Sequence, residues 1–158
     1  MEPTDWLAVA EIYRQGIETG NATFQQTIPT WDEWNNAHAV NCRLVAEVGN
    51  EIAGWAALSS VSARAVYSGV AEVSVYIGNN YKGRHVGTLL LQSLISESER
   101  NGYWTLQSGI FPENTASISL HKKTGFREIG YREKVSKMKN VWRNTVLFER
   151  RSTLTGVE

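Results

Sequence analysis

The chain has 158 residues, of which 42% are hydrophobic, and its 16 basic and 16 acidic residues give a formal net charge of zero. This length and apolar content predict one globular domain over residues 1–158, and the lack of a basic excess argues against nucleic acid as a partner. One cysteine, Cys42, allows no internal disulfide, and no apolar run reaches the roughly 20 residues that span a bilayer, so we expect a cytoplasmic protein without a membrane partner.

The start of the chain predicts two helices separated by a polar loop. Asp5 is a candidate N-cap for the first helix, in which apolar residues from Leu7 to Ile17 recur at helical spacing. The polar loop covers 20–30, and a second, shorter helix is expected over 31–39.

Three strands are expected next. The strands 42–48 and 51–60 flank the pair Gly49-Asn50, whose residues favour the tight turn of a β-hairpin. The strand 71–77 alternates cleanly. One side of it carries Ala71, Val73, Val75 and Ile77, and the other carries Glu72, Ser74 and Tyr76.

The second half of the chain predicts helices and strands in alternation. Helices are expected over 85–100, ended by Asn101-Gly102, and from an N-cap at Asn114 to Lys123. Further strands are predicted over 103–111, 126–133 and 145–149, with a Lys-rich turn between the last two and a frayed tail over 151–158. The element order β-β-β-α-β-α-β indicates an α/β layered domain with a mixed sheet.

The most informative segment is the turn that precedes the helix at 85–100. It carries Gly83 and Gly87, with Lys82 and Arg84 on either side of the first glycine. The first amides of a helix have no intrahelical acceptor and lie at the positive end of its dipole, so this turn suits a phosphate or pyrophosphate. An ordinary strand–helix connection with solvated basic residues fits the spacing equally well. The P-loop and G-x-G-x-x-G motifs are both missing.

The stretch Lys82-Gly-Arg-His-Val-Gly87 resembles the acyl-CoA-binding signature of GNAT acetyltransferases. Two positions depart from it: Lys82 stands for Gln or Arg, and His85 stands for the first glycine. The resemblance runs from about Trp6 to Arg150 and favours the phosphinothricin-type subgroup. The segments that carry it are Gly54-Trp-Ala-Ala-Leu58, Ala71-Glu-Val-Ser-Val-Tyr-Ile77, Ile110-Phe-Pro-Glu-Asn-Thr-Ala-Ser117, Ser119-Leu-His-Lys-Lys-Thr-Gly-Phe126 and Trp142-Arg-Asn-Thr-Val146.

The resemblance implies the fold and the activity. The implied GNAT fold has a mixed, mostly antiparallel central sheet with helices on both faces, and its first strand is short or missing here. The implied activity is acetyl-CoA-dependent N-acetylation of the α-amino group of a small free amino acid, such as phosphinothricin or methionine sulfoximine or sulfone. Such relatives are commonly homodimers. No metal is expected, because three histidines and one cysteine lack ligand spacing.

The resemblance also implies which residues hold acetyl-CoA. The amides of the turn bind the pyrophosphate, the strand segment 75–77 pairs with the pantetheine arm, and the start of the next helix contacts the arm from the other side. For His85 the alternatives are a tolerated substitution and a phosphate contact, and Asn114 can also act as a helix N-cap. The expected cofactor-binding residues are Val75, Tyr76, Ile77, Lys82, Gly83, Arg84, His85, Val86, Gly87, Thr88, Asn114 and Ser117.

Two residues are candidates for proton transfer. Glu72 lies in a strand otherwise built for burial, where a carboxylate is costly unless it faces a polar cleft or is paired, and desolvation would raise its pKa toward that of a useful base. The alternative is a structural salt bridge to Arg64 or Arg132. His121 stands where many GNAT enzymes carry a thiolate-protonating tyrosine. Its ordinary pKa near 6.5 suits an acid or a base, and the alternative is a structural histidine.

For the acceptor, the resemblance implies Phe24, Arg64, Tyr67 and Thr145. The Arg64 guanidinium suits the carboxylate of a free amino acid, whereas a loop arginine in solvent and a core-filling Phe24 are the alternatives. Relatives often carry Glu where this chain has Gln25, which leaves the exact acceptor open. Other possible functions are acetylation of a polyamine, an aminoglycoside or a protein N-terminus, and a non-catalytic acyl-CoA sensor. The presence of both Glu72 and His121 argues against the sensor.

Overall fold

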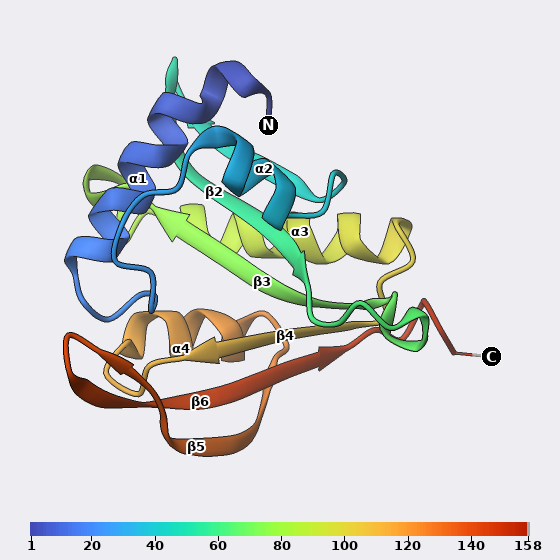
Figure 1. The fold of residues 1–158 in the computed structure, drawn as a ribbon. Coiled ribbons are helices and arrows are strands. Elements are labelled where there is room, and N and C mark those ends of the chain that lie inside the picture. The colour runs from blue at the N-terminus through green and yellow to red at the C-terminus, as the bar shows by residue number, and fades with distance from the viewer. Residues whose placement is uncertain (158) are drawn as a thin grey trace.

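The computed structural model describes residues 1–157. It contains a six-stranded sheet in the order β1-β2-β3-β4-β6-β5 (Figure 1). Neighbouring strands are antiparallel except β3 and β4, which are parallel. The predicted α/β fold with a mixed, mostly antiparallel sheet is confirmed. No strand precedes the first helix in the described part of the chain.

The helices and strands follow the predicted order. The strands are β1 (Arg43–Val48), β2 (Glu51–Ser60), β3 (Val70–Ile77), β4 (Thr105–Ile110), β5 (Arg127–Met138) and β6 (Val141–Arg151). The helices are α1 (Trp6–Glu18), α2 (Trp31–Ala37), α3 (Val86–Arg100) and α4 (Thr115–Lys123). None of these helices is long and apolar enough to cross a bilayer, as far as residues 1–157 are concerned.

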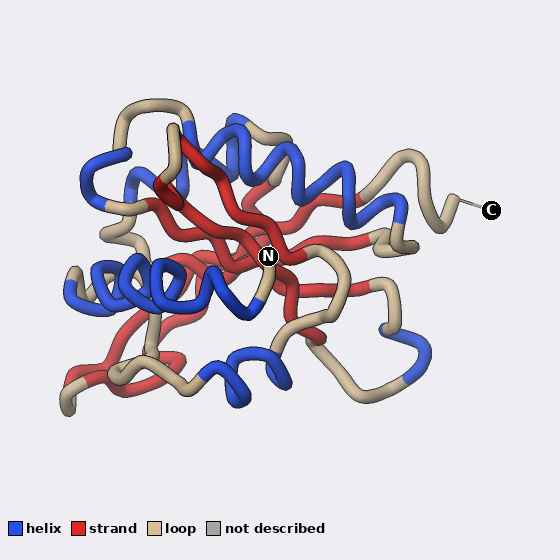
Figure 2. Tube along the Cα trace, turned by 90° about the horizontal axis from the view of Figure 1, so that it is seen from above, coloured by secondary structure: helices blue, strands red, loops and turns tan. Residues whose placement is uncertain are grey.

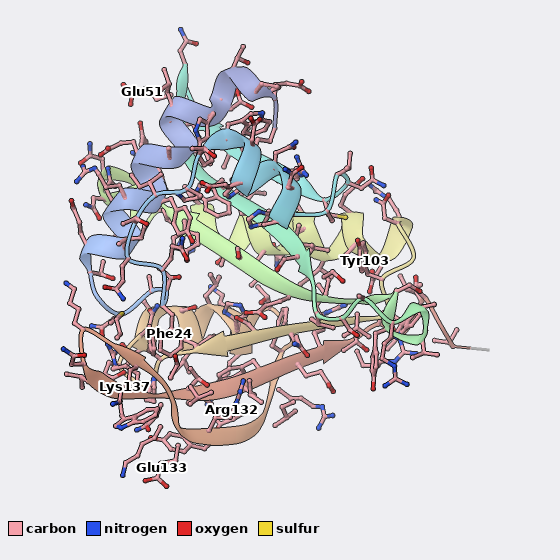
Figure 3. All side chains as sticks on the ribbon, viewed as in Figure 1. Phe24, Glu51, Tyr103, Arg132, Glu133 and Lys137 are labelled. Carbon is pink, nitrogen blue, oxygen red and sulfur yellow. The ribbon has the colours of Figure 1, made fainter. Side chains whose placement is uncertain are left out.

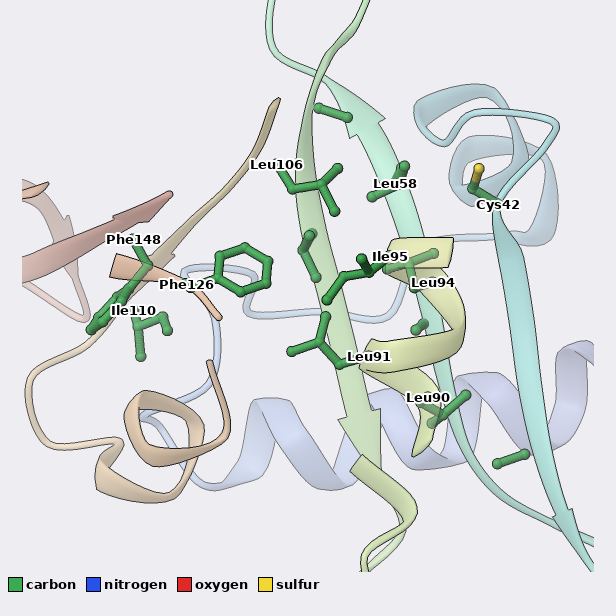
Figure 4. Close-up of a cluster of buried hydrophobic side chains, with 14 of the residues drawn as sticks. Cys42, Leu58, Leu90, Leu91, Leu94, Ile95, Leu106, Ile110, Phe126 and Phe148 are labelled. Atoms are coloured by element: carbon green, nitrogen blue, oxygen red, sulfur yellow. The ribbon is translucent and has the colours of Figure 1, made fainter. Parts of the chain in front are cut away.

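Helices cover both faces of the sheet (Figure 2). Side chains alternate along β2, so Trp55 and Ala57 pack with α1 and α2, whereas Ala56 and Leu58 belong to the core under α3. Figure 4 shows how the leucines of α3 meet this second core, which also contains Cys42. The two cores hold β3 rigidly from both sides along most of its length.

The start of α1 differs from the prediction. Asp5 stands at the N-cap position, but its side chain makes no hydrogen bond to the helix. It instead accepts a hydrogen bond of 2.6 Å from the backbone N–H of Glu2, within a short 3-10 turn over Pro3–Asp5. The helix is held by its apolar face, with Val9 and Ile12 buried, rather than by a cap.

The last hairpin is longer than predicted. The Lys-rich segment after Glu133 continues β5 to Met138, and the turn is the pair Lys139-Asn140, both of which have positive φ. Such a pair matches the right-handed twist of two antiparallel strands. The prediction missed these residues because β5 is an exposed edge strand, so its side chains carry no apolar alternation.

The tail also differs from the prediction, because the residues after β6 are tied to the end of α3. Ser152 is only 4% exposed. Its N–H donates to the Trp104 carbonyl at 2.8 Å, and its hydroxyl donates to Glu99 at 2.8 Å. The Thr155 hydroxyl donates to the Glu99 carbonyl at 3.0 Å. The chain is therefore not frayed from Ser152 to Thr155.

The contact between β3 and β4 positions the site. The two strands pair only over Val70–Glu72 with Thr105–Gln107, although β3 continues to Ile77 and β4 to Ile110. In Figure 1 the two strands diverge toward the end of the sheet that lies beside α4. Beyond Glu72 the edge of β3 that faces β4 has no strand partner among the described residues, so its backbone groups are available to a ligand.

Candidate active site

The divergence of β3 and β4 opens a cleft of about 880 Å³. Its walls are the two strands, the turn before α3, the start of α4 and the loop after α1. The cleft passes through the sheet. Val75 and His121 line it from the face covered by α3 and α4, whereas Glu72 and Tyr76 line it from the face covered by α1.

The turn before α3 presents unpaired amides to this cleft. Helix α3 begins at Val86, and its N-cap residue His85 has left-handed backbone angles, φ 63° and ψ 8°, without a side-chain cap. Gly83 also has positive φ, 75°. The predicted cofactor residues of this turn line the cleft, except Arg84, whose guanidinium lies 5.5 Å from the centre of the Tyr81 ring. The uncapped helix start suits an anion.

The left-handed conformation of His85 leads to a prediction about stability. A non-glycine residue in this region costs about 1–2 kcal/mol, so His85→Gly should stabilise the protein by about 1 kcal/mol and raise its Tm by about 2–4 °C. Gly83→Ala is the matched control. A Cβ there meets no atom within 4 Å, so its only effect is backbone strain, and its Tm should fall. A lower Tm for His85→Gly in thermal unfolding would mean that the imidazole makes stabilising contacts that outweigh the strain.

Glu72 is the last residue of β3 that pairs with β4. It pairs with Ser59 on β2 and with Gln107 on β4, and its carboxylate faces the cleft. Desolvation by the surrounding residues raises the pKa of the Glu72 carboxyl above its ordinary value, although the side chain itself is exposed toward the cleft, and the positive charge of Arg132 partly offsets the rise. Neither Arg64 nor Arg132 forms an ion pair with it in the described chain. The salt-bridge alternative therefore has no support.

His121 is 1% exposed and lines the cleft from α4. Its Nδ1 lies 2.8 Å from the Ser117 carbonyl oxygen. Because a carbonyl only accepts, Nδ1 carries the proton and the neutral ring has its lone pair on Nε2. Nε2 is buried and has no partner among residues 1–157. Burial lowers the His121 pKa, so near neutral pH this nitrogen is an acceptor.

Asn114 caps α4, which was one of its two predicted roles. Its Oδ1 accepts a hydrogen bond of 3.1 Å from the Ser117 N–H. Its Nδ2 donates to the Asn21 carbonyl at 3.1 Å. The side chain keeps one N–H for a ligand, since the amide nitrogen carries two.

The predicted acceptor residues do not all reach the cleft. Phe24 and Thr145 line it, and the Phe24 ring packs against Phe111 at 4.7 Å between centroids. Arg64 and Tyr67 lie on the connection between β2 and β3, where the guanidinium sits 5.7 Å from the Tyr67 ring centre, and neither lines the cleft. Figure 3 shows Phe24 near the end of β4 and Arg132 at the β5–β6 ribbon.

Several lining residues were not singled out from the sequence. Tyr13 was read only as an apolar position of the first helix, yet its ring packs 4.9 Å from that of Tyr76, between centroids, and lines the cleft. Gly16 has no pattern that marks it, but a Cβ there would lie 2.6 Å from the Tyr76 ring. The other lining residues that were missed include Asn21, Ser108, Phe111 and Glu113. For the last two, the motif around Asn114 was an available signal.

Comparison with known proteins agrees with this geometry. Residues 6–126 match the acetyltransferase (GNAT) family. The chain is 31% identical over 153 residues to the phosphinothricin N-acetyltransferase of Alcaligenes faecalis. The match covers 92% of this chain and 77% of the relative.

Solved structures of the same fold include a ribosomal-protein-alanine N-acetyltransferase from Brucella melitensis. It is 27% identical, has a TM-score of 0.88, and the match covers 96% of this chain and 97% of that one. A Salmonella typhimurium protein solved with its cofactor acetyl-CoA is 25% identical and has a TM-score of 0.87. The match covers 96% of this chain and 90% of that one. The match to the family covers most of the chain, so this protein is an acetyltransferase and belongs to the GNAT family.

Proposed function

We propose that the protein transfers the acetyl group of acetyl-CoA to the α-amino group of a small free amino acid such as phosphinothricin or methionine sulfoximine. The divergence of β3 and β4 at Glu72 carries the proposal, because it brings a carboxylate of raised pKa and an uncapped helix start to one cleft. The acetyl-CoA bound to the Salmonella relative and the activity named for the Alcaligenes relative support the donor and the acceptor.

Acetyl-CoA, the acetyl donor, would lie on the face of the sheet that α3 and α4 cover. The pyrophosphate would accept hydrogen bonds from the amides of residues 82–88, with Lys82 and Arg84 adding positive charge at the rim. The pantetheine arm would pair with the open edge of β3 at Val75–Ile77, as an added strand does. Asn114 would donate its remaining N–H from the other side of the cleft, next to Ser117.

The transfer needs two proton acceptors. The ammonium of the acceptor first loses a proton to Glu72, directly or through water, and the amine attacks the thioester carbonyl carbon. The nitrogen of the tetrahedral intermediate is then positively charged with two protons, and it must lose one of them to become the amide. The unpartnered Nε2 of His121 can take this proton and deliver it to the sulfur as the C–S bond breaks. The products are the N-acetyl amino acid and coenzyme A.

Arg132 is the cation on the acceptor side of the sheet. Val146 belongs to the core under α3, so its neighbour Thr145 faces the opposite side, as Glu72 does. Arg132 is the register partner of Thr145 across β5 and β6, which places both side chains on one face. Within the described chain the guanidinium makes no ion pair. Neither Arg64 nor Arg132 lines the cleft, but the charge of Arg132 acts on the Glu72 carboxylate. We therefore assign the acceptor carboxylate to Arg132 and Thr145 in place of Arg64.

A panel of acceptors tests the function by release of free coenzyme A. The panel contains phosphinothricin, methionine sulfoximine, methionine sulfone, spermidine, kanamycin and a peptide that begins with alanine. Turnover of the first three supports the proposal. Preference for the peptide would instead indicate a protein acceptor, which agrees with the name ribosomal-protein-alanine N-acetyltransferase of the Brucella relative. Tight binding of acetyl-CoA without turnover of any amine would indicate a sensor. The homodimer implied by the resemblance stays a prediction.

Replacing Arg132 tests the assignment of the carboxylate. Arg132→Met should raise the KM for methionine sulfoximine by about 10-fold or more, because charge-assisted hydrogen bonds are lost, and should leave the KM for its carboxamide unchanged. Arg127→Met is the matched control, since Arg127 lies on the same strand, is 72% exposed and pairs with Glu149. An equal KM increase for the acid and the amide would contradict a contact with the carboxylate.

A further inference from the structure

The loop after α1 forms one wall of the cleft without regular secondary structure. Residues 21–25 of this loop line the same cleft as Glu72 and Thr145. The hydrogen bonds that side chains of the loop accept from its backbone are local. The Thr19 hydroxyl accepts from the Asn21 N–H, and the Thr23 hydroxyl accepts from the Gln25 N–H. The position of this loop therefore depends on contacts with distant parts of the chain.

Arg143 supplies two of these contacts, both of them side-chain hydrogen bonds. It lies on β6, its side chain is 14% exposed, and it does not line the cleft. Its Nη1 donates to the Gly20 carbonyl at 2.9 Å, and its Nη2 donates to Asn21 Oδ1 at 2.8 Å. The two bonds join residues more than 120 positions apart in the chain.

The same guanidinium also fixes the opposite wall. Nη2 lies 3.3 Å from Glu113 Oε2, and the Arg143 Cζ lies 4.2 Å from the centre of the Phe111 ring. Phe111 in turn packs against Phe24 of the loop. Arg143 thus contacts the ends of both walls, the loop after α1 and the connection from β4 to α4.

Asn21 links this arrangement to the start of α4. Its side chain accepts from Arg143, and its backbone carbonyl accepts from Asn114. A planar guanidinium donates to a carbonyl and to an amide oxygen in a fixed fork while its flat face stacks on an aromatic ring, and the point-like ammonium of lysine lacks this fixed geometry.

We propose that Arg143 is a positioning residue that sets the acceptor wall, residues 21–25, at a fixed distance from Glu72. The inference rests on the proposed function, in which the acceptor occupies this side of the cleft. Arg143 does not line the cleft, so we expect it to touch neither substrate. Its loss should therefore weaken acceptor use more than donor use, because the turn at 82–88 makes no contact with it among the hydrogen bonds and ion pairs of the described chain, and its link to Asn114 is indirect, through Asn21.

The test compares Arg143→Met and Arg143→Lys with the control Arg100→Met, which removes an exposed arginine paired only with Glu97 at the end of α3. Three readouts are the KM for methionine sulfoximine, the KM for acetyl-CoA, and amide hydrogen exchange of residues 20–25 without any substrate. We expect the acceptor KM of Arg143→Met to rise by about 10-fold or more and the acetyl-CoA KM to stay within about 2-fold of wild type. Exchange of the loop should become faster, and Arg143→Lys should restore at most part of the loss.

Asn21→Ala removes a single contact of Arg143 and keeps the test decisive if Arg143→Met does not fold. Its effect on the acceptor KM should not add to that of Arg143→Lys, because both changes break the same hydrogen bond. Additive effects, unchanged loop exchange, or an equal rise in both KM values would overturn the positioning role. Hydrogen exchange needs no turnover, so a protein that acetylates none of the tested amines would refute the proposed function while the loop measurement still decides on Arg143.

Discussion

Glu72→Gln should lower kcat by about 100- to 1000-fold, the range of a lost general base, while the Kd for acetyl-CoA stays within about 2-fold of wild type. Glutamine keeps the shape of the side chain and its place opposite Ser59 and Gln107. It removes only the carboxylate that would take the ammonium proton. Single-turnover measurements with bound acetyl-CoA separate this loss from weaker binding.

The same substitution should not destabilise the protein. Burial raises the pKa of Glu72 in the folded state, so its contribution to stability is present below the pKa of the unfolded chain and is lost as the pH rises through the folded pKa. At pH 7 the ionised carboxylate is less favourable in the folded chain than in the unfolded one, but solvent at the exposed side chain screens the effect and keeps it small, and the neutral amide has no such effect. The Tm of Glu72→Gln at pH 7 should therefore equal or exceed that of wild type, and the difference should vanish toward pH 4.

Glu149→Gln is the matched control for Glu72→Gln. Glu149 is a carboxylate on the same sheet, paired with Arg127 across β5 and β6, and it does not line the cleft. Its kcat should match wild type. If Glu72→Gln binds acetyl-CoA and keeps most of its turnover, Glu72 is not the base.

Local sequence signals predicted the parts of the cleft that depend on short segments. The alternation over 71–77 put Glu72 and Tyr76 on the face opposite Val73, as the two cores show. The glycines around Lys82 marked a turn into a helix, and Asn114 marked a helix start. Each of these features is determined by residues within a few positions of one another.

Features that depend on distant contacts were not predictable. The separation of β3 from β4 after Glu72 is a property of two strands whose paired residues are 35 positions apart, and no residue of either strand marks it. Arg143 occurs in a motif from the sequence, yet its partners lie in the loop after α1. Arg64 was implied by the resemblance and supported by its chemistry, and the connection between β2 and β3 holds it outside the cleft lining.

His121→Asn should lower kcat by about 100-fold and change the shape of its pH dependence. Asparagine can still donate to the Ser117 carbonyl, so the fold around α4 is kept while the acceptor nitrogen is lost. In wild type both Glu72 and His121 must be unprotonated. Their pKa values move toward each other, up from about 4.5 and down from about 6.5, and below both pKa values log kcat should fall with a slope of two as the pH drops. In His121→Asn or Glu72→Gln the slope should be one.

The opposite assignment gives a different profile. If His121 had to supply a proton at the start of the reaction, only its protonated form would be active. Burial lowers its pKa below 6.5, so wild-type kcat would then already decline between pH 6 and pH 7 and His121→Asn would abolish that decline. A kcat that does not decline over this range, and that falls with the double slope at lower pH, is the result expected of an imidazole whose proton sits on Nδ1 against the Ser117 carbonyl and whose Nε2 accepts.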